Sequence, residues 1–395
     1  MTAATQPVTA SRIRWPLLLV LASLAAVAPV ATDLYLPGFP AIGHDLGTDA
    51  SGVQLTLTSF LVGLAFGQLV MGPLADRFGR RRPLVISTAV CVLAGIVCAL
   101  APTLPVLVGG RLVQGFAGAG GMVIGRAVIS DLVTGRAAAR AFTLMMTVGG
   151  VAPVLAPTVG GLLAGPVGWR GMLATVALLC LAMLVGVIVV VAETRPPTGE
   201  APASWLGALR VVARSRGYWA PVAVFALSFG VMMAYIAASP FLYQNVVGLS
   251  AIGYGILFGV NATGLITAGA VASRLVHRIE PRAMVRGCIA VQVAATVLFL
   301  VLAVAGAPAW TLPVAIFVAV TANGGIMGNS AALAMARVRP VAGTGSAVLG
   351  FSQFALGAVV SPLVGLGGAH SAVVPAAVMA SASLLAFGAS RLMRR

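Results

Sequence analysis

Twelve long apolar segments, separated by short polar ones, run through this chain of 395 residues. A helix that crosses a membrane needs roughly 20 mostly apolar residues, and each segment comes close to or exceeds that length. Hydrophobic residues make up 60% of the chain and charged residues only 8%, far from the balance of a soluble domain. The pattern excludes a soluble enzyme, a secreted disulfide module and a disordered chain. The expected spans are 15–36, 52–72, 83–101, 106–130, 141–164, 171–192, 218–243, 251–273, 284–305, 310–333, 344–367 and 371–390.

Arginine supplies all 24 of the basic residues other than histidine, and its distribution predicts the topology. If the N-terminus is cytoplasmic, 21 of the 24 arginines fall on cytoplasmic segments. This is the bias of the positive-inside rule, and it accounts for the formal net charge of +16 without a nucleic-acid partner. We therefore expect a multi-pass protein of the cytoplasmic (inner) membrane with both termini in the cytoplasm. The four cysteines lie in apolar runs and are interpreted as small hydrophobic residues, with no metal site.

A polar stretch at 193–217 divides the chain into two halves of six spans each. The halves repeat weakly: a Gly-rich span and its basic loop recur in both, and a Pro/Gly pattern lies late in the fifth and eleventh spans. We predict an all-α membrane protein of two pseudo-symmetric six-helix bundles. The expected units are a cytoplasmic tail (1–14), an N-terminal bundle (15–192), a linker (193–217), a C-terminal bundle (218–390) and a second tail (391–395). Within the linker, 204–216 is amphipathic enough to form an interfacial helix.

Three motifs carry a resemblance to a known family. GPLADRFGRRR at 72–82 resembles the loop 2–3 signature of the major facilitator superfamily, GRLVQG at 110–115 resembles its RxxQG motif, and APVLAPTVGG at 152–161 resembles its antiporter motif, with Ala156 where Gly is common. TDLYLPGFPAI, RAVISDL and GFSQFALGAVVSP narrow the resemblance to the bicyclomycin/chloramphenicol-resistance (Bcr/CflA) branch of drug:proton antiporters. Ser130 departs from that branch, where Arg often precedes the Asp.

The resemblance implies two groups of residues with roles in conformational change. A cytoplasmic latch is expected at the loop, as opposed to a simple positive-inside anchor. Its residues are Gly72, Asp76, Arg77, Gly79, Arg80 and Arg81, together with Asp131. The antiporter motif, Pro153, Pro157, Gly160 and Gly161, is expected to bend its helix and favour export, the alternative being a kink with only a packing role.

Asp33 and Arg111 are ionisable residues inside expected spans, and such residues are functional candidates. The helical rise places them at similar depths, about 6 Å and about 8–9 Å from the outer end. Burial favours the neutral acid and a nearby guanidinium favours the carboxylate, so Asp33 is interpreted as the proton-coupling residue and Arg111 as its tuning or structural partner. The alternative is that Asp33 lies at a hydrated helix end. Arg126 either lines the inner cavity or extends to the cytoplasmic surface.

Polar and aromatic residues in the spans are candidates for a substrate pocket or, equally, for interhelical hydrogen bonds. The set is Tyr35, Gln114, Arg126, Tyr235, Asn261, Asn323 and Gln353.

The function expected from these observations is proton-coupled efflux of small amphipathic compounds, such as chloramphenicol- or bicyclomycin-type antibiotics. No GxxxxGK[ST] motif occurs, which disfavours ATP-driven transport by this chain, and we expect no cofactor. The expected partners are a drug-like small molecule, protons and the lipid bilayer, with the protein as a monomer. An exporter or symporter of a metabolite or amino acid on the same fold remains open. A membrane enzyme is disfavoured because His44, His277 and His370 are scattered and no catalytic motif accompanies them.

Overall fold

In the computed structural model, residues 14–133, 135–194 and 205–393 are described, and within these ranges the chain contains helices, turns and loops but no strand. The N-terminal half contains seven α-helices. They are α1 (Trp15–Asp33), α2 (Phe39–Asp45), α3 (Ala50–Phe78), α4 (Arg81–Ala99), α5 (Leu104–Leu132), α6 (Gly135–Ala164) and α7 (Gly168–Val190). A single 3₁₀ turn, η1 (Leu36–Gly38), joins α1 to α2.

The C-terminal half begins after a stretch, 195–204, that lies outside the described residues. Its helices are α8 (Trp205–Arg214), α9 (Arg216–Phe241), the π-helical η2 (Leu242–Val246), α10 (Ala251–Leu275), α11 (Pro281–Val304), α12 (Leu312–Met335), α13 (Ala342–Gly365) and α14 (Val373–Arg391). Two 3₁₀ turns, η3 (Ala309–Thr311) and η4 (Arg339–Val341), precede α12 and α13. Twelve helices in the described ranges are long and apolar enough to cross a membrane, which confirms the predicted number of spans.

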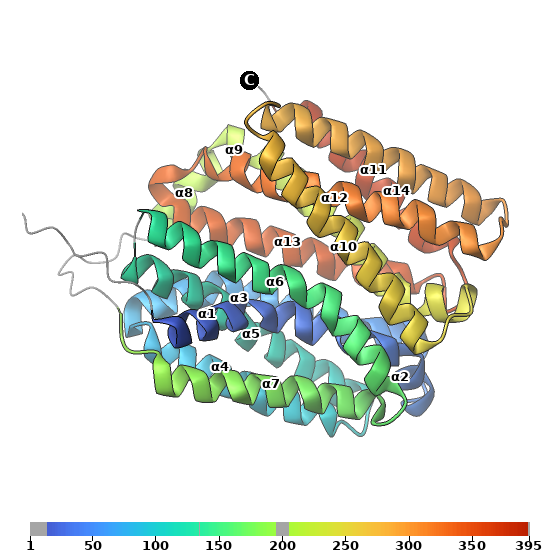
Figure 1. The fold of residues 1–395 in the computed structure, drawn as a ribbon, viewed down its shortest axis with the longest axis horizontal. Helices are drawn as coiled ribbons and strands as arrows, with labels where there is room; N and C mark the ends of the chain where they lie inside the picture. Colours follow the sequence, from blue (N-terminus) through green and yellow to red (C-terminus); the bar gives the residue numbers. More distant parts are fainter. Residues whose placement is uncertain (1–13, 134, 195–204, 394–395) are drawn as a thin grey trace, which may run out of the picture.

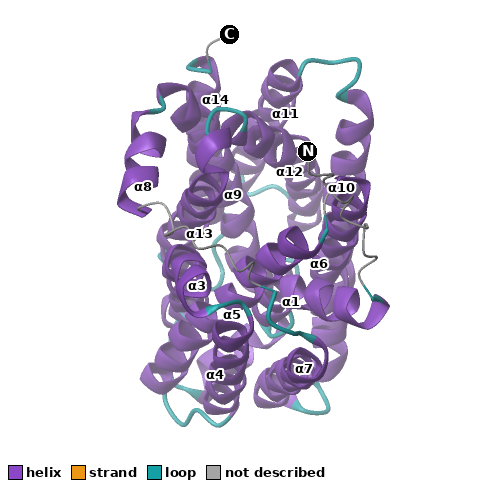
Figure 2. Cartoon of the chain, turned by 90° about the vertical axis from the view of Figure 1, so that its left-hand side faces the viewer, coloured by secondary structure: helices purple, strands orange, loops and turns teal. Residues whose placement is uncertain are grey.

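The spans form two groups that lie side by side (Figure 1). In the first half α3 packs on α5, α4 on α7 and α1 on α6; in the second half α11 packs on α12, α10 on α12 and α9 on α14. Two further contacts, α3 with α13 and α6 with α10, join the halves. Figure 2 views the molecule along the helices and shows α1, α3 and α6 on one side and α9, α10 and α13 on the other.

The helices run between two ends of the molecule. The terminal face is the end where α1 begins and α14 ends, and it includes the α3–α4 connection; it lies to the left in Figure 1. The far face is the opposite end, with η1, α2 and η2.

Small residues allow the spans to pack closely. A side chain at Gly115 of α5 would meet the backbone of Phe60 in α3, and one at Gly324 of α12 would meet the carbonyl oxygen of Leu265 in α10. Helices in membranes associate through such close backbone approach, since lipid offers no hydrophobic drive for association. The glycines of the apolar runs therefore define which helix faces meet.

Several boundaries differ from those predicted, most of all the end of α3, at Phe78 instead of 72, and the start of α6, at Gly135 instead of 141. The first span, expected to run to residue 36, ends as an α-helix at Asp33, and the chain continues as buried η1 and then α2. Pro37 lacks a backbone N–H, which favours the tighter turn there. The amphipathic segment forms α8, but Arg216 belongs to α9.

Candidate functional site

The two bundles are joined by polar contacts toward the far face. Three hydrogen bonds between described residues cross the interface: Gln54 Nε2 to Ala237 O at 3.2 Å, Thr158 Oγ1 to Gly255 O at 3.1 Å, and Gln244 Nε2 to Pro37 O at 3.2 Å. Each involves a residue within about two turns of the far end of its helix. In this conformation the bundles are therefore held together at the far face.

Asp33 lies at the interface between the bundles. It is the last residue of α1, and only 2% of its surface is exposed, so it is not at a hydrated helix end. It borders a cavity of about 10 Å³, which has room for hardly more than one water molecule. The other lining residues come from four helices: Pro153 of α6; Met232, Tyr235 and Ile236 of α9; Phe258, Ala262 and Leu265 of α10; and Val320 of α12. Asp33 thus shares a small cavity with three helices of the opposite bundle.

Thr32 is the hydrogen-bond partner of the Asp33 carboxyl group. Its Oγ1 lies 2.8 Å from Asp33 Oδ1, 3.0 Å from Ala28 O and 3.1 Å from Pro29 O. A hydroxyl has one proton to donate. With Asp33 ionised that proton goes to the carboxylate; with Asp33 neutral the acid donates to Oγ1 and the hydroxyl donates to a backbone carbonyl. The pair therefore accommodates both protonation states without moving a helix.

Arg111 is fully buried inside the N-terminal bundle. Its Nη1 donates to Gln114 Oε1 at 2.7 Å and its Nη2 to Ala31 O at 2.8 Å. The guanidinium carbon lies 4.5 Å from the ring centre of Tyr35 and 4.1 Å from that of Phe60, in the geometry of cation–π contacts. Ala31 precedes Asp33 by two residues, so Arg111 anchors the end of α1 that carries the acid. The ion pairs of the described residues do not include one between Arg111 and Asp33.

Tyr35 and Gln114 belong to this Arg111 cluster. Both are fully buried, and the Tyr35 hydroxyl lies 3.0 Å from Thr56 Oγ1 within the same bundle. Neither residue borders the cavity at Asp33. In this structure the two residues support Arg111. Their role in substrate binding stays a prediction.

Tyr235 lines the cavity at Asp33 from the C-terminal bundle, and Asn261 joins it in an aromatic cluster. Asn261 Nδ2 lies 2.9 Å from the Tyr235 hydroxyl and 3.0 Å from the Tyr243 hydroxyl. The Tyr235 ring stacks on Phe258 with centres 5.2 Å apart, and Tyr254 closes the group at 5.9 Å from Phe258. Asn261 keeps one buried amide atom without a partner.

Sequence reasoning did not single out Tyr243, Tyr254 or Phe258. A signal was present, because three of the five tyrosines of the chain fall between positions 235 and 254. Their convergence depends on η2, which returns the chain from α9 to α10.

The remaining pocket candidates lie at separate places. Arg126 and Gln353 are half-buried, and Asn323 is buried with its Nδ2 3.5 Å from Met232 Sδ. Arg126 Nε donates to Met122 O at 2.9 Å, within its own helix. Its second contact, to Gln68 of α3, involves a residue that the sequence had not singled out.

The loop between α3 and α4 is held by charges of the N-terminal bundle. Arg80 pairs with Asp76 at 2.5 Å and with Asp131 of α5 at 2.9 Å. Glu193 accepts the backbone N–H groups of Arg80 and Arg81 at 2.8 Å and 3.1 Å, where a negative charge stabilises the start of α4. Burial alone would lower the pKa of Arg80, but the hydrogen bonds to Asp131 and Asp76 outweigh it and raise that pKa.

The connection is shorter than the predicted loop at 72–82, because α3 runs to Phe78 and includes Gly72, Asp76 and Arg77. Gly79 has φ +88°, a conformation that side chains other than hydrogen rarely adopt, and a side chain there would meet the Glu193 carboxylate. Gly72 faces Val123 of α5, and the Arg77 guanidinium lies 5.2 Å from the Phe78 ring centre. All of these contacts join elements of one bundle.

The α6 motif lies where the bundles meet. Pro153 and Pro157 are both inside the continuous helix. A side chain at Gly160 would meet the carbonyl oxygen of Leu34, next to Asp33, and one at Gly161 would meet Ala251 O at the start of α10. The motif thus permits both the packing of α6 on the end of α1 and the contact between α6 and α10.

Replacing Gly161 by Val is expected to reduce export strongly, because its first side-chain carbon would lie 2.5 Å from the Ala251 oxygen and would force α6 and α10 apart. Gly150→Val is the matched control, since nothing lies within 4 Å of that position in the same helix. The measurement is resistance at equal membrane levels of both variants. Equal resistance of the two would show that this contact is not needed.

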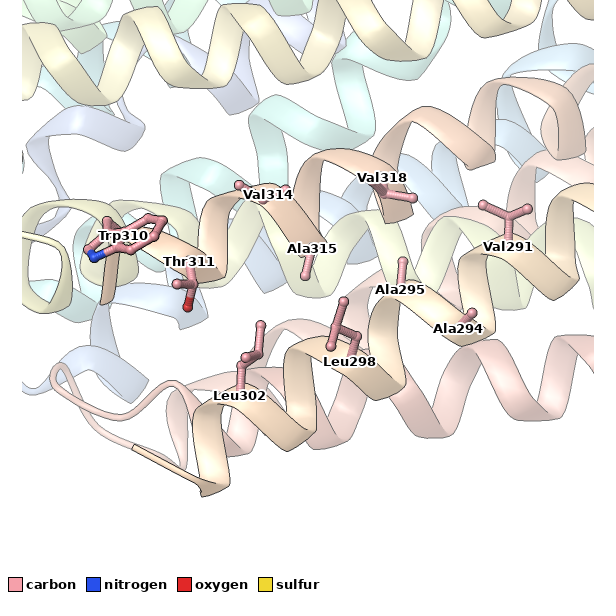
Figure 3. Close-up of a pocket in the computed structure, with 10 residues that line it drawn as sticks. All are labelled: Val291, Ala294, Ala295, Leu298, Leu302, Trp310, Thr311, Val314, Ala315 and Val318. Carbon is pink, nitrogen blue, oxygen red and sulfur yellow. The ribbon is translucent and has the colours of Figure 1, made fainter. Parts of the chain in front are cut away.

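An apolar pocket of about 600 Å³ lies between α11 and α12, away from the bundle interface. Figure 3 shows side chains of both helices directed into it, from Val291 to Leu302 on α11 and from Trp310 to Val318 on η3 and α12. None of the predicted site residues lines this pocket. In the part of the chain that the structure describes, no group of three or more His, Cys, Asp or Glu side chains is arranged to hold a metal ion.

Known proteins resemble this chain in sequence over most of its length. Residues 21–362 match the profile of the Major Facilitator Superfamily. Relatives include the "Uncharacterized MFS-type transporter YdgK" of Bacillus subtilis, 34% identical over 89% of each chain. A "Bicyclomycin resistance protein homolog" of Haemophilus influenzae is 29% identical over 88% of each chain, and a "Chloramphenicol resistance protein" of Pseudomonas aeruginosa is 29% identical over 88% of this chain and 82% of its own. The resemblance inferred from the motifs is confirmed.

The crystal structure of a D-xylose–proton symporter has the same fold, with a TM-score of 0.72, 15% identity and coverage of 95% of this chain and 98% of that one. The chain is thus a multi-pass protein of the inner membrane and a transporter, not an enzyme. Its twelve helices, its motifs and the profile match together place it in the major facilitator superfamily.

Proposed function

We propose that this protein is a proton-coupled exporter of small amphipathic compounds, of the kind that includes chloramphenicol- or bicyclomycin-type antibiotics. The observation that carries the proposal is the burial of Asp33 between the two bundles, with a hydroxyl partner suited to either protonation state. The names of relatives that confer resistance to bicyclomycin and chloramphenicol support the class of cargo.

The coupling follows from alternating access. When the bundles separate at one face, Asp33 comes into contact with water on that side and exchanges its proton; when they close, an ionised carboxylate in the apolar cavity is costly. Proton loading at the far face and proton release at the terminal face then drive cargo in the opposite direction. Cargo binds between the bundles, where Tyr235, Asn261, Arg126 and Gln353 belong to the proposed path.

The direction of transport follows from the proposed orientation. The arginine-rich loops belong in the cytoplasm by the positive-inside rule, which makes the terminal face cytoplasmic. There the Asp76–Arg80–Asp131 network acts as the latch: it holds α3, α4 and α5 as one unit while the bundles rock. The protein acts as a monomer, since each chain contains both bundles.

A susceptibility panel tests the proposal. Expression in a drug-sensitive bacterium is expected to raise resistance to at least one of chloramphenicol, bicyclomycin or a sulfonamide, and a protonophore is expected to abolish the increase. Resistance that persists with the protonophore would remove proton coupling. If no compound on the panel is affected and a metabolite or amino acid is exported instead, the class of cargo is wrong.

A further inference from the structure

A second charged position lies on the path between the bundles, nearer the terminal face than Asp33. Helix α5 turns Gly118 toward Val27 of α1 and Ala119 toward Gly67 of α3. At 100° per residue, Arg126 falls between these two directions and therefore points into the space between α1 and α3. It lies six residues before Leu132, about 9 Å from the terminal end of its helix.

The described residues satisfy only part of the hydrogen-bonding capacity of the Arg126 guanidinium. A guanidinium has five N–H donors, and here Nε donates to Met122 O at 2.9 Å while Nη2 reaches Gln68 Oε1 at a long 3.4 Å. The arginines in ion pairs among residues 14–133, 135–194 and 205–393 are Arg80, Arg170 and Arg282. Arg126 therefore holds a charge inside a membrane span without a carboxylate from the described chain.

Gln68 places this charge at the contact between the bundles. Its amide oxygen would lie 3.0 Å from a side chain at Gly350 of α13 in the C-terminal bundle. Next to it, Phe66 of α3 and Phe351 of α13 meet edge to face with ring centres 5.8 Å apart. The Arg126–Gln68 pair thus borders the seam between the bundles, nearer the terminal face than Asp33.

An unpaired guanidinium in an apolar span is costly unless water or a ligand compensates it. A carboxylate is a suitable ligand, because its two oxygens match the planar N–H groups of arginine in charge-assisted hydrogen bonds. Among the described residues Arg126 has no carboxylate partner, so its charge attracts an anion to this part of the seam. An acidic cargo therefore suits this position.

We propose that Arg126, positioned by Gln68, binds the anionic group of the cargo, so that the compounds exported include amphipathic organic acids. This inference rests on the proposed export function and adds to it a class of compound and a residue that distinguishes that class.

The test is equilibrium binding of radiolabelled 2-naphthoate and its methyl ester to the full-length chain in nanodiscs, corrected for empty nanodiscs. The wild type is expected to bind the acid more tightly than the ester. Arg126→Gln is expected to weaken binding of the acid about tenfold, since a hydrogen bond to a charged group is lost, and to leave the ester within about twofold. Arg126→Lys should restore part of the difference. Arg274→Gln, at an exposed position near the end of α10, is the matched control and should change neither.

The outcomes separate the two proposals. The acidic class of cargo is overturned if the wild type binds acid and ester equally, or if Arg126→Gln weakens binding of both equally. Arg126 then has a structural role. Protonophore-sensitive resistance in the susceptibility panel would still uphold export. If the panel shows no export but the acid-selective binding depends on Arg126, the site stands and the transport proposal fails.

Discussion

Export is expected to fall to the level of cells without the gene when Asp33 is replaced by Asn. Asparagine has nearly the shape of the protonated acid and still has a group to bond Thr32, but it cannot release a proton. Since Asp33 is 2% exposed and faces a cavity of about 10 Å³, no water-filled space is available for another acid to take over its place. The variant should therefore close its bundles as the proton-loaded protein does while losing coupled transport.

Two measurements make this prediction specific. Drug-induced pH change in proteoliposomes should vanish in Asp33→Asn, and binding of the compound identified by the panel should weaken, since the variant imitates the proton-loaded state, from which an antiporter has released its cargo. Glu280→Gln is the matched control, because Glu280 is exposed and pairs only at 3.9 Å with Arg282. Full export by Asp33→Asn would remove this residue from the coupling mechanism and leave the fold unaffected.

Replacing Arg111 by Met is expected to destabilise the protein and to abolish most of the export. Methionine fills a similar volume but leaves Ala31 O and Gln114 Oε1 buried without a donor. Each orphaned acceptor costs roughly 1–3 kcal/mol, so a loss of about 3 kcal/mol in the free energy of unfolding is expected after the relief of burying a charge is subtracted. Export falls because the Asp33 end of α1 loses its anchor at Ala31.

A double-mutant cycle tests whether the loss of stability in Arg111→Met comes from the acceptors left without a donor. In the Arg111→Met background, Gln114→Leu removes one orphaned acceptor, so it should cost less than it does in the wild type, with a coupling of about 1 kcal/mol. Melting temperatures in detergent report the four stabilities. Arg111→Lys should not restore export, since a single ammonium cannot reproduce the planar fork that reaches both acceptors between two rings. Additive effects of the two changes would contradict this account.

Much of the fold was predictable from the chain because hydropathy acts locally. Runs of about 20 apolar residues require helices in lipid whatever their neighbours are, so the number of spans and their approximate limits follow from the sequence. The depth of Asp33 and Arg111 follows in the same way from the helical rise, and both side chains are indeed buried near the same end of α1.

The surroundings of these residues were not predictable. Pro153, Tyr235, Phe258 and Val320 meet Asp33 from four other helices, and no local pattern in any of them signals the others. The direction in which each helix turns its side chains depends on close backbone approach at positions such as Gly115 and Gly161, which tertiary packing decides. For the same reason Gln68 looked like any polar residue in a span.

The sequence by itself determined that this chain is a two-part membrane transporter, with Asp33, Arg111 and Arg126 well inside its spans, because burial in lipid penalises charge regardless of fold. Only the tertiary structure decided that Arg111 binds a carbonyl and two rings instead of Asp33, that Asp33 borders a cavity shared with the opposite bundle, and that Arg126 lies beside the seam with no carboxylate partner among the described residues. Hydropathy and helical rise give a residue its depth, whereas its neighbours are set by contacts between helices distant in the chain.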